Sequence, residues 1–281
     1  MVNIKYSKKI VNRKSLKTLQ FFCKIWHFLT KMVNICKFLY IIELIGGLMK
    51  VGVIGAMDTE IKMLVENLEN VVESKEVFLK FYEGNFGKTP VVIVKSGVGK
   101  VNAGICTQTL ITKFGCTHII NTGVAGGIAK ELAVMDTVVS TDAIFHDVNA
   151  VGFGYDMCEI PGLGTTNFPA SLEMLEIAEK AFATLKEENK VKGKLVKGRV
   201  ATGDVFVDTR EKKMAIKEIC NPTCCDMEGA AIGQVAYLYK IPYIIIRSIS
   251  DLAENTDEVY LEDEAAANCS NITAEILKNL A

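Results

Sequence analysis

Long apolar runs, metal-binding cysteine pairs and histidine clusters are all missing from this sequence. No stretch of about 18 uncharged apolar residues occurs, so a membrane-spanning helix is not expected. The nine cysteines are scattered without a Cys-X-X-Cys pair and the three histidines show no ligand spacing, which argues against a zinc site or a disulfide framework. Reduced thiols in a cytoplasm fit this cysteine usage best.

Positive charge is also scarce, except at the N-terminus. The net charge is −1, but residues 1–48 carry nine Lys or Arg and a single acidic residue, Glu43. The remaining residues therefore hold 23 basic against 32 acidic side chains, a net charge of −9. Non-specific binding of nucleic acid depends on clustered Lys and Arg that neutralise phosphates, so an acidic body argues against it.

The basic segment 1–48 has two possible explanations. Lys17, Lys24 and Lys31 recur every seven residues, which would place them on one side of a helix at a membrane surface. Alternatively, translation begins at Met49, because Gly46-Gly47-Leu48 is what an in-frame purine-rich ribosome-binding sequence would encode just ahead of a bacterial start codon. We favour the second explanation and expect no membrane association, with residues 49–281 forming the folded domain.

From Met49 onward, strand-like and helix-like patterns alternate, and no linker or repeat interrupts them. This alternation predicts a single α/β domain. The polar, glycine-rich residues 147–169 form the longest predicted loop. Apolar runs predict strands near 51–56, 78–86, 90–95, 117–121, 134–145, 195–202 and 243–246. Apolar periodicity predicts helices near 61–68, 172–185, 228–239 and 262–280. Another predicted helix begins within 96–104 and runs to about Phe114.

Three carboxylates lie where predicted strands end. Glu60 follows the strand 51–56 in the first turn of a helix, Glu228 stands at a strand-to-helix turn, and Asp251 follows the apolar strand 243–246. Open α/β sheets bind ligands at the carboxyl ends of their strands, so these acids predict an active site. Taken singly, Glu60 or Glu228 would simply suit a helix N-terminus.

The segment Gly97-Val98-Gly99-Lys100 superficially resembles a phosphate-binding loop. Its spacing matches neither the dinucleotide motif nor the P-loop, which would require glycine and Ser/Thr at other positions. A tight turn between strand and helix explains the glycines. A further interpretation is that Ser96 and nearby backbone amides line a pocket for a sugar or water, since helix N-termini carry unpaired N–H groups.

The motifs, in their order and spacing, resemble those of the bacterial 5′-methylthioadenosine/S-adenosylhomocysteine nucleosidases. The resemblance extends from Met49 to about Ala253 and excludes residues 1–48. It rests on Ile54–Met57 with Glu60, Ser96–Val101, Asn121–Gly123 with Ala125–Gly127, His146-Asp147 with Phe153–Tyr155, Gly203-Asp204 with Phe206, Asp226–Glu228, and Ser248–Asp251.

The resemblance implies a three-layer α/β/α fold of the nucleoside phosphorylase type, with a central mixed, mostly parallel sheet. It also implies a homodimer that needs no cofactor or metal. The implied reaction is hydrolysis of the N-glycosidic bond, which releases adenine and either methylthioribose or S-ribosylhomocysteine, as in methionine salvage. Asp251 matches the general acid that protonates adenine at N7 with help from Ser250, and Glu60 matches the carboxylate that activates water, with Ser96 and Arg247 nearby.

The remaining implied contacts hold the nucleoside. Glu228 matches the ligand of the ribose hydroxyls, Met227 packs beside the sugar, and Phe206 with the backbone of Val207 holds the purine. Two departures from the family pattern stand out. Asp226 replaces a common glutamate, and either Tyr260 or Leu261 occupies the place of an aromatic residue that covers the sugar.

The residue types suit this chemistry. Adenine leaves poorly as an anion, so an acid must protonate it while the ribose becomes cationic and favours nearby carboxylates, as in glycosidases. Three alternatives remain from sequence: a purine nucleoside phosphorylase, a futalosine-type or 5′-deoxyadenosine nucleosidase, and a non-catalytic nucleoside sensor. Phosphate would be repelled by Asp58-Thr59-Glu60, and a sensor would be expected to have lost an acid or a base.

Overall fold

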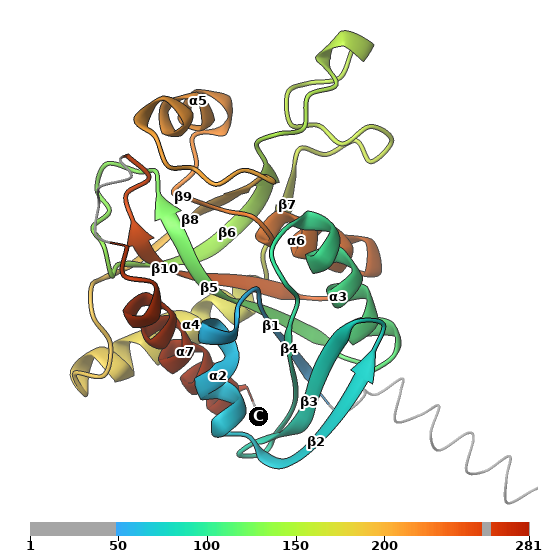
Figure 1. The fold of residues 1–281 in the computed structure, drawn as a ribbon, viewed down its shortest axis with the longest axis vertical. Coiled ribbons are helices and arrows are strands. Elements are labelled where there is room, and N and C mark those ends of the chain that lie inside the picture. Colours follow the sequence, from blue (N-terminus) through green and yellow to red (C-terminus); the bar gives the residue numbers. More distant parts are fainter. Residues whose placement is uncertain (1–48, 255–259, 281) are drawn as a thin grey trace, which may run out of the picture. The chain divides into compact units, whose positions relative to one another are not determined.

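The computed structural model describes residues 49–254 and 260–280 (Figure 1). The two explanations of residues 1–48 and the start at Met49 concern a segment outside the described residues. Within the described ranges, every helix is too short or too polar to cross a bilayer.

Ten strands of the described chain form one mixed sheet. They are β1 (Val51–Gly55), β2 (Glu69–Glu76), β3 (Leu79–Phe86), β4 (Thr89–Lys95), β5 (His118–Gly127), β6 (Thr137–Phe145), β7 (Asn167–Pro169), β8 (Leu195–Thr202), β9 (Cys224–Asp226) and β10 (Tyr243–Asp251). Their order is β10-β6-β8-β9-β5-β1-β4-β3-β2, with β7 beside β6. Because β10 also pairs with β5, the strands β5, β10, β6, β8 and β9 close into a ring.

Helices cover both faces of this sheet. They are α2 (Asp58–Glu66), α3 (Lys100–Thr112), α4 (Leu172–Glu187), α5 (Arg210–Cys220), α6 (Gly229–Tyr239) and α7 (Glu262–Asn279), with a short 3-10 helix η1 (Val151–Phe153). One layer contains α2, α4 and α7, and α3 packs on α6 in the other (Figure 1). The two larger of the three apolar clusters in the described chain lie one beneath each layer, which confirms the predicted three-layer arrangement.

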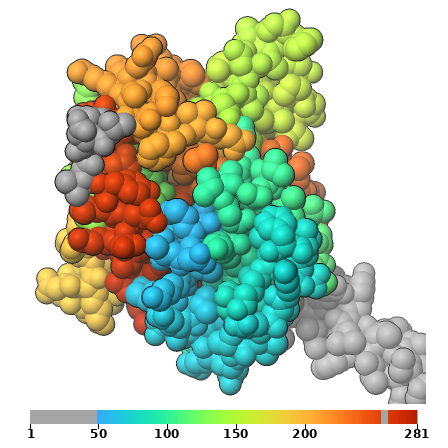
Figure 2. All heavy atoms as spheres, viewed as in Figure 1, coloured from blue at the N-terminus to red at the C-terminus, as the bar shows by residue number. Residues whose placement is uncertain are grey.

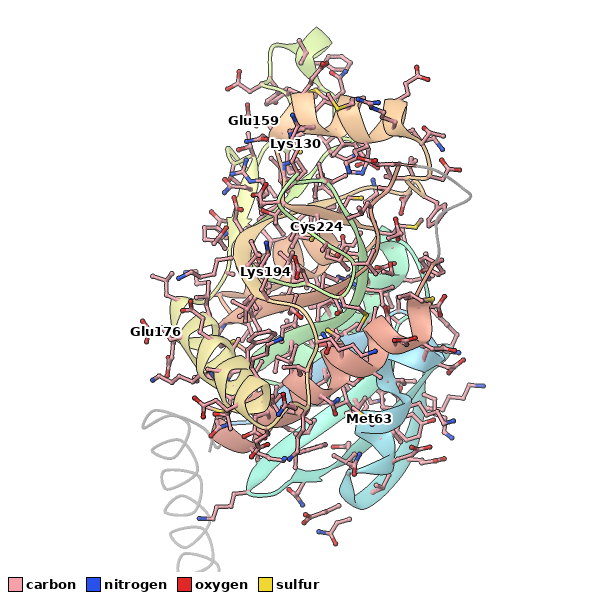
Figure 3. The ribbon with its side chains drawn as sticks, turned by 90° about the vertical axis from the view of Figure 1, so that its left-hand side faces the viewer. Met63, Lys130, Glu159, Glu176, Lys194 and Cys224 are labelled. Carbon is pink, nitrogen blue, oxygen red and sulfur yellow. The ribbon has the colours of Figure 1, made fainter. Side chains whose placement is uncertain are left out.

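The helices bury one side each and leave the other in water. On α4, Met174, Leu175, Ala178 and Phe182 are buried at helical spacing. Figure 3 shows Glu176 of α4 pointing away from the sheet, whereas Cys224 of β9 lies inside the molecule.

The sequence predictions for the fold are largely confirmed, and the differences have physical causes. The sheet is mixed as predicted, but only five of its ten pairings are parallel rather than most of them. The edge strand β2 and the helix α5 were not predicted, because both are rich in charged residues. The predicted loop 147–169 also contains η1 and the short strand β7.

Three parallel neighbours, β1, β5 and β10, bring Glu60 and Asp251 to one end of the sheet, whereas Glu228 arrives there from β9, which runs antiparallel to β5. In the register, Asn121 of β5 stands beside Ile54 of β1 and Ile245 of β10. Two residues further along β5, Gly123 stands beside Arg247. A side chain at Gly123 would collide with the carboxylate of Glu60 and the guanidinium of Arg247, so only glycine leaves room for this pair.

Candidate active site

A cavity of about 250 Å³ opens at the carboxyl ends of these strands. In Figure 2, the blue of α2, the green of the segment that leads into α3 and the orange of the segment after β8 meet on one face of the molecule. The cavity is lined by Ala56, Met57, Glu60, Val98, Val124, Ala125, Gly126, Val205, Phe206, Val207, Cys225, Asp226, Met227, Glu228, Arg247, Ser250, Asp251 and Tyr260.

Glu60 is held rigidly at the floor of the cavity. Its Oε2 accepts hydrogen bonds from the backbone N–H groups of Ala56 (2.6 Å) and Met57 (3.1 Å), and its Oε1 accepts one from Val124 (2.9 Å). Burial raises the pKa of Glu60 above its ordinary value, while Arg247 and the three N–H donors oppose that shift. A carboxylate with fixed geometry and a raised pKa is suited to accept a proton from water.

Arg247 is the only cation among the described residues that line the cavity, and it is fully buried. Its Nη2 lies 2.6 Å from Asp226 Oδ2 and 3.4 Å from Glu228 Oε2, and its Nη1 lies 3.8 Å from Glu60 Oε1. Nη2 also donates to Asn121 Oδ1 at 2.7 Å. Burial disfavours the charged form, but the three carboxylates raise the pKa of Arg247, so it stays a cation.

Glu228 begins the helix α6 and faces the loop before α3. Its Oε1 accepts a hydrogen bond from the backbone N–H of Gly99 at 3.0 Å. Burial raises the pKa of Glu228 to about 7, Arg247 and the Gly99 N–H oppose the shift, and Asp226 and Glu60 add to it. Glu228 therefore changes its charge near neutral pH.

Asp226 makes the shortest of the three ion pairs with Arg247. Its Oδ1 accepts hydrogen bonds from the Thr202 hydroxyl (2.5 Å) and the Gly229 N–H (3.2 Å), while its Oδ2 faces Arg247. The shorter aspartate in place of a glutamate thus remains an ion-pair partner of Arg247. Neither Asp226 nor Asn121 was predicted as a site residue, and only the Asp-Met-Glu motif was a sequence signal for Asp226.

Asp251 is the last residue of β10 and lies partly exposed on the cavity wall. The Ser250 hydroxyl donates to Asp251 Oδ2 at 2.8 Å, and the backbone N–H of Ala253 donates to Oδ1 at 2.8 Å. These two donors fix the orientation of the carboxyl group at the end of β10.

Apolar side chains form the other walls of the cavity. Phe206, Val207 and Met227, which the sequence predicts as binding residues, all line it. Tyr260 lines it as well, whereas Leu261 is the residue that precedes α7 and does not. Flat apolar walls beside a few fixed polar groups are typical of a site for a small aromatic ligand.

Ser96 is the one predicted site residue that does not line this cavity. Its buried hydroxyl donates to the backbone carbonyl of Gly97 at 2.8 Å and lies 3.3 Å from that of Gly55. Ser96 instead borders a second, open cavity beside the β2–β3 hairpin, together with Gly97 and Lys95. All eight other predicted residues, from Glu60 to Asp251, line the first cavity.

The arrangement is able to perform acid–base chemistry on a ligand with a flat ring. Among the described residues, four carboxyl groups and one guanidinium border the cavity, so acidic groups outnumber cations there. Such a site favours a cationic transition state and a neutral nucleophile. No group of three or more metal-binding side chains occurs in the part of the chain that the structure describes.

Residues 50–280 match the family model of the phosphorylase superfamily. The fold and the site thus define a member of this superfamily, to which the chain belongs. A curated relative, the 5′-methylthioadenosine/S-adenosylhomocysteine nucleosidase of Psychromonas ingrahamii, is 38% identical over 236 residues, which cover 83% of this chain and 100% of the relative. Within the superfamily, the chain belongs to the 5′-methylthioadenosine/S-adenosylhomocysteine nucleosidase family.

Solved structures agree with this assignment. The nucleosidase of Neisseria meningitidis in complex with methylthio-immucillin-A superimposes with a TM-score of 0.78 at 35% identity, covering 82% of this chain and 99% of that one. The nucleosidase of Colwellia psychrerythraea in complex with adenine also gives a TM-score of 0.78, at 33% identity, covering 83% and 96% of the two chains.

Proposed function

We propose that this protein hydrolyses the N-glycosidic bond of 5′-methylthioadenosine and S-adenosylhomocysteine. The products are adenine and methylthioribose or S-ribosylhomocysteine. The observation that carries the proposal is the convergence of Glu60, Glu228 and Asp251 on one cavity with apolar walls. Membership of the nucleosidase family and the adenine ligand of one solved relative support it further.

Each acid has a distinct role in the proposed mechanism. Asp251, oriented by Ser250, protonates adenine at N7 as the C1′–N9 bond stretches. Glu228 accepts hydrogen bonds from the ribose hydroxyls while positive charge develops on the sugar. Glu60 takes a proton from the attacking water, and no cofactor takes part.

Phosphorolysis is the nearest alternative, and the charges of the site oppose it. Phosphate ions bind to clusters of positive groups, usually arginines. Here the single lining cation, Arg247, already faces Asp226, Glu228 and Glu60. A phosphate in this cavity would meet unneutralised carboxylates, whereas a water molecule would not be repelled.

We therefore expect adenine release from methylthioadenosine in buffer free of phosphate. The measurement is a coupled assay of free adenine, with and without added phosphate, on the full chain and on a chain that begins at Met49. Equal rates in both buffers and for both chains are expected, and the second comparison tests our proposal that residues 49–281 suffice. A strict requirement for phosphate would refute hydrolysis. A panel of 5′-substituted nucleosides, including futalosine and 5′-deoxyadenosine, would identify the preferred 5′ group.

The pKa of Glu228 predicts how activity depends on pH. The ionised carboxylate accepts hydrogen bonds from the ribose hydroxyls more strongly than the neutral acid does, and burial raises the pKa of Glu228 to about 7. The ratio kcat/KM should therefore rise as pH increases through about 7. Glu228→Gln should remove this step and lower kcat/KM at pH 8 by about 10- to 100-fold, as expected for a hydrogen bond to a charged group. Steady-state rates from pH 5.5 to 9 test this.

The matched control is Glu218→Gln on the exposed side of α5. It should retain both the rate and the pH step. If the unmodified protein showed a flat profile between pH 6 and 8, the role of Glu228 would be wrong.

We propose, finally, that the protein is a homodimer that acts in the cytoplasm. Exposed apolar side chains support a dimer: Phe206 is 60% exposed at the cavity and Phe153 is 88% exposed on η1. A second copy would cover these side chains. Sedimentation equilibrium would measure the mass in solution.

The seven cysteines of the described residues are free and buried, which agrees with a reducing compartment.

A further inference from the structure

Three residues of the family motifs, Lys100, Asp147 and Asp204, take no part in the proposed mechanism. They come from three separate segments: the start of α3, the segment after β6 and the segment after β8. The structure brings them together in one ion-pair network. This network lies next to two segments that line the cavity.

Asp147 connects two of the segments through one oxygen. Its Oδ2 accepts a hydrogen bond from Lys100 Nζ at 2.5 Å and another from the backbone N–H of Asp204 at 3.1 Å. The side chains of Lys100 and Asp147 are only 25% and 22% exposed, so water screens this pair less than a typical surface pair. Lys100 Nζ also lies over the ring of Phe145, 5.5 Å from its centre.

Asp204 closes the network from the third segment. Its Oδ1 accepts a hydrogen bond from the backbone N–H of Lys100 at 2.9 Å, and its Oδ2 lies 3.7 Å from Lys100 Nζ. A carboxylate from a distant segment thus caps the N-terminus of α3, where the helix dipole favours negative charge. A side chain at Gly99 would come within 3.2 Å of Asp204 Oδ1, and the positive φ of Gly99 (100°) also favours glycine there.

The network adjoins the cavity on two sides. On one side, Gly99 immediately precedes Lys100, and its N–H donates to Glu228 Oε1 at 3.0 Å. On the other side, Asp204 immediately precedes Val205, Phe206 and Val207, which line the cavity. The position of Lys100 therefore determines the position of the Gly99 N–H, which donates to Glu228, the proposed ligand of the ribose. The position of Asp204 likewise determines that of residues 205–207, which form the wall proposed to contact the purine.

We propose that Lys100, Asp147 and Asp204 are positioning residues that form a charged clamp beside the nucleoside-binding cavity. The inference rests on the proposed function. The clamp holds the Gly99 N–H against Glu228 and holds residues 205–207 at the cavity, without touching the substrate itself. Because it orders groups that bind the nucleoside before and during the reaction, its loss should weaken binding more than it slows the chemical step.

The first test is Lys100→Met, which removes the charge and retains the length of the side chain. KM for methylthioadenosine should rise by about tenfold, with kcat reduced by less than about threefold. Lys100→Arg restores the charge and should return KM to within about threefold of the original. Lys113→Met is the matched control, since Lys113 follows the other end of α3 and pairs with Glu76 far from the cavity. It should leave KM unchanged.

The pH profile distinguishes positioning from simple loss of stability. The Gly99 N–H holds the pKa of Glu228 down, so releasing it should move the acidic step of kcat/KM to higher pH in Lys100→Met. The other charged groups that face Glu228 are Arg247 on β10, Asp226 on β9 and Glu60 on α2, and the variant leaves all three in place. Asp147→Asn should cause the same shift. In the double variant Lys100→Met/Asp147→Asn, KM should rise by no more than about twofold beyond its value in either single variant.

A second measurement requires no substrate. In the unmodified protein the Gly99 amide should exchange its hydrogen slowly, and in Lys100→Met at least about tenfold faster, with no change in Lys113→Met. An unmodified protein without nucleosidase activity would refute the proposed function, yet this exchange would still test the clamp. Unchanged exchange and unchanged KM in a folded Lys100→Met protein would overturn the clamp. A rise in KM that Lys100→Arg fails to reverse would also overturn it.

Discussion

Replacement of Asp251 by asparagine should lower kcat for methylthioadenosine by at least about a hundredfold, because an amide has no acidic proton to give to adenine N7. The change is nearly isosteric. An asparagine Oδ1 keeps one acceptor in place for the Ser250 hydroxyl or the Ala253 N–H, the two donors that orient Asp251. KM should therefore change little, since the amide still fills the wall of the cavity. A hundredfold loss corresponds to about 2.7 kcal/mol of transition-state stabilisation.

Rapid-quench measurement of adenine release under single-turnover conditions would isolate this step. Glu254→Gln is the matched control, because Glu254 lies three residues further along and pairs with Lys213 at 2.9 Å without lining the cavity. It should turn over normally. A substrate analogue whose leaving group departs readily without protonation should lose much less rate in Asp251→Asn. Near-normal turnover of methylthioadenosine by the folded variant would eliminate Asp251 as the general acid.

The sequence predicted the fold where apolar residues dominate and failed where charge does. The strand at 195–202 was predicted with the boundaries of β8, and the apolar run at 51–56 matches β1 within one residue. In contrast, the predicted strand 243–246 continues in the structure as β10 through Arg247 to Asp251. A polar pattern suggested an end there, but Arg247 stays buried because three carboxylates neutralise it.

For the site as well, the sequence predicts some residues and misses the contacts between distant ones. The ends of predicted strands pointed to Glu60, Glu228 and Asp251, and all three line the same cavity. Sequence alone did not indicate that Asn121 binds Arg247 or that the Gly99 N–H binds Glu228, because these contacts join residues 126 and 129 positions apart. Ser96 shows the converse: its motif predicted a binding residue, yet neighbouring carbonyl groups engage its hydroxyl. Such pairings depend on tertiary structure, which local patterns do not encode.

Replacement of Glu60 by glutamine should also reduce kcat by at least about a hundredfold, because a neutral amide cannot take a proton from the attacking water. Three backbone N–H groups donate to the carboxylate of Glu60. A glutamine accepts through only one of its two terminal atoms, and its NH₂ group would face an N–H donor. The variant thus loses the base and also disturbs the three hydrogen bonds that hold this side chain. Its folding must therefore be checked by thermal unfolding alongside the rate.

The position of Glu60 allows a sharper experiment than loss of rate alone. Glu66→Gln, at the exposed last position of the same helix α2, is the matched control and should retain full activity. Burial raises the pKa of Glu60, and a base works only when deprotonated, so Glu60 contributes an acidic step to kcat that rises with pH. This step should disappear in Glu60→Gln and persist in Glu66→Gln. Addition of a small neutral nucleophile stronger than water, such as hydroxylamine, which attacks without first losing a proton, should partly restore bond cleavage in Glu60→Gln but not in Asp251→Asn. Equal rescue of both variants would mean that the two carboxylates do not divide the acid and base roles as proposed.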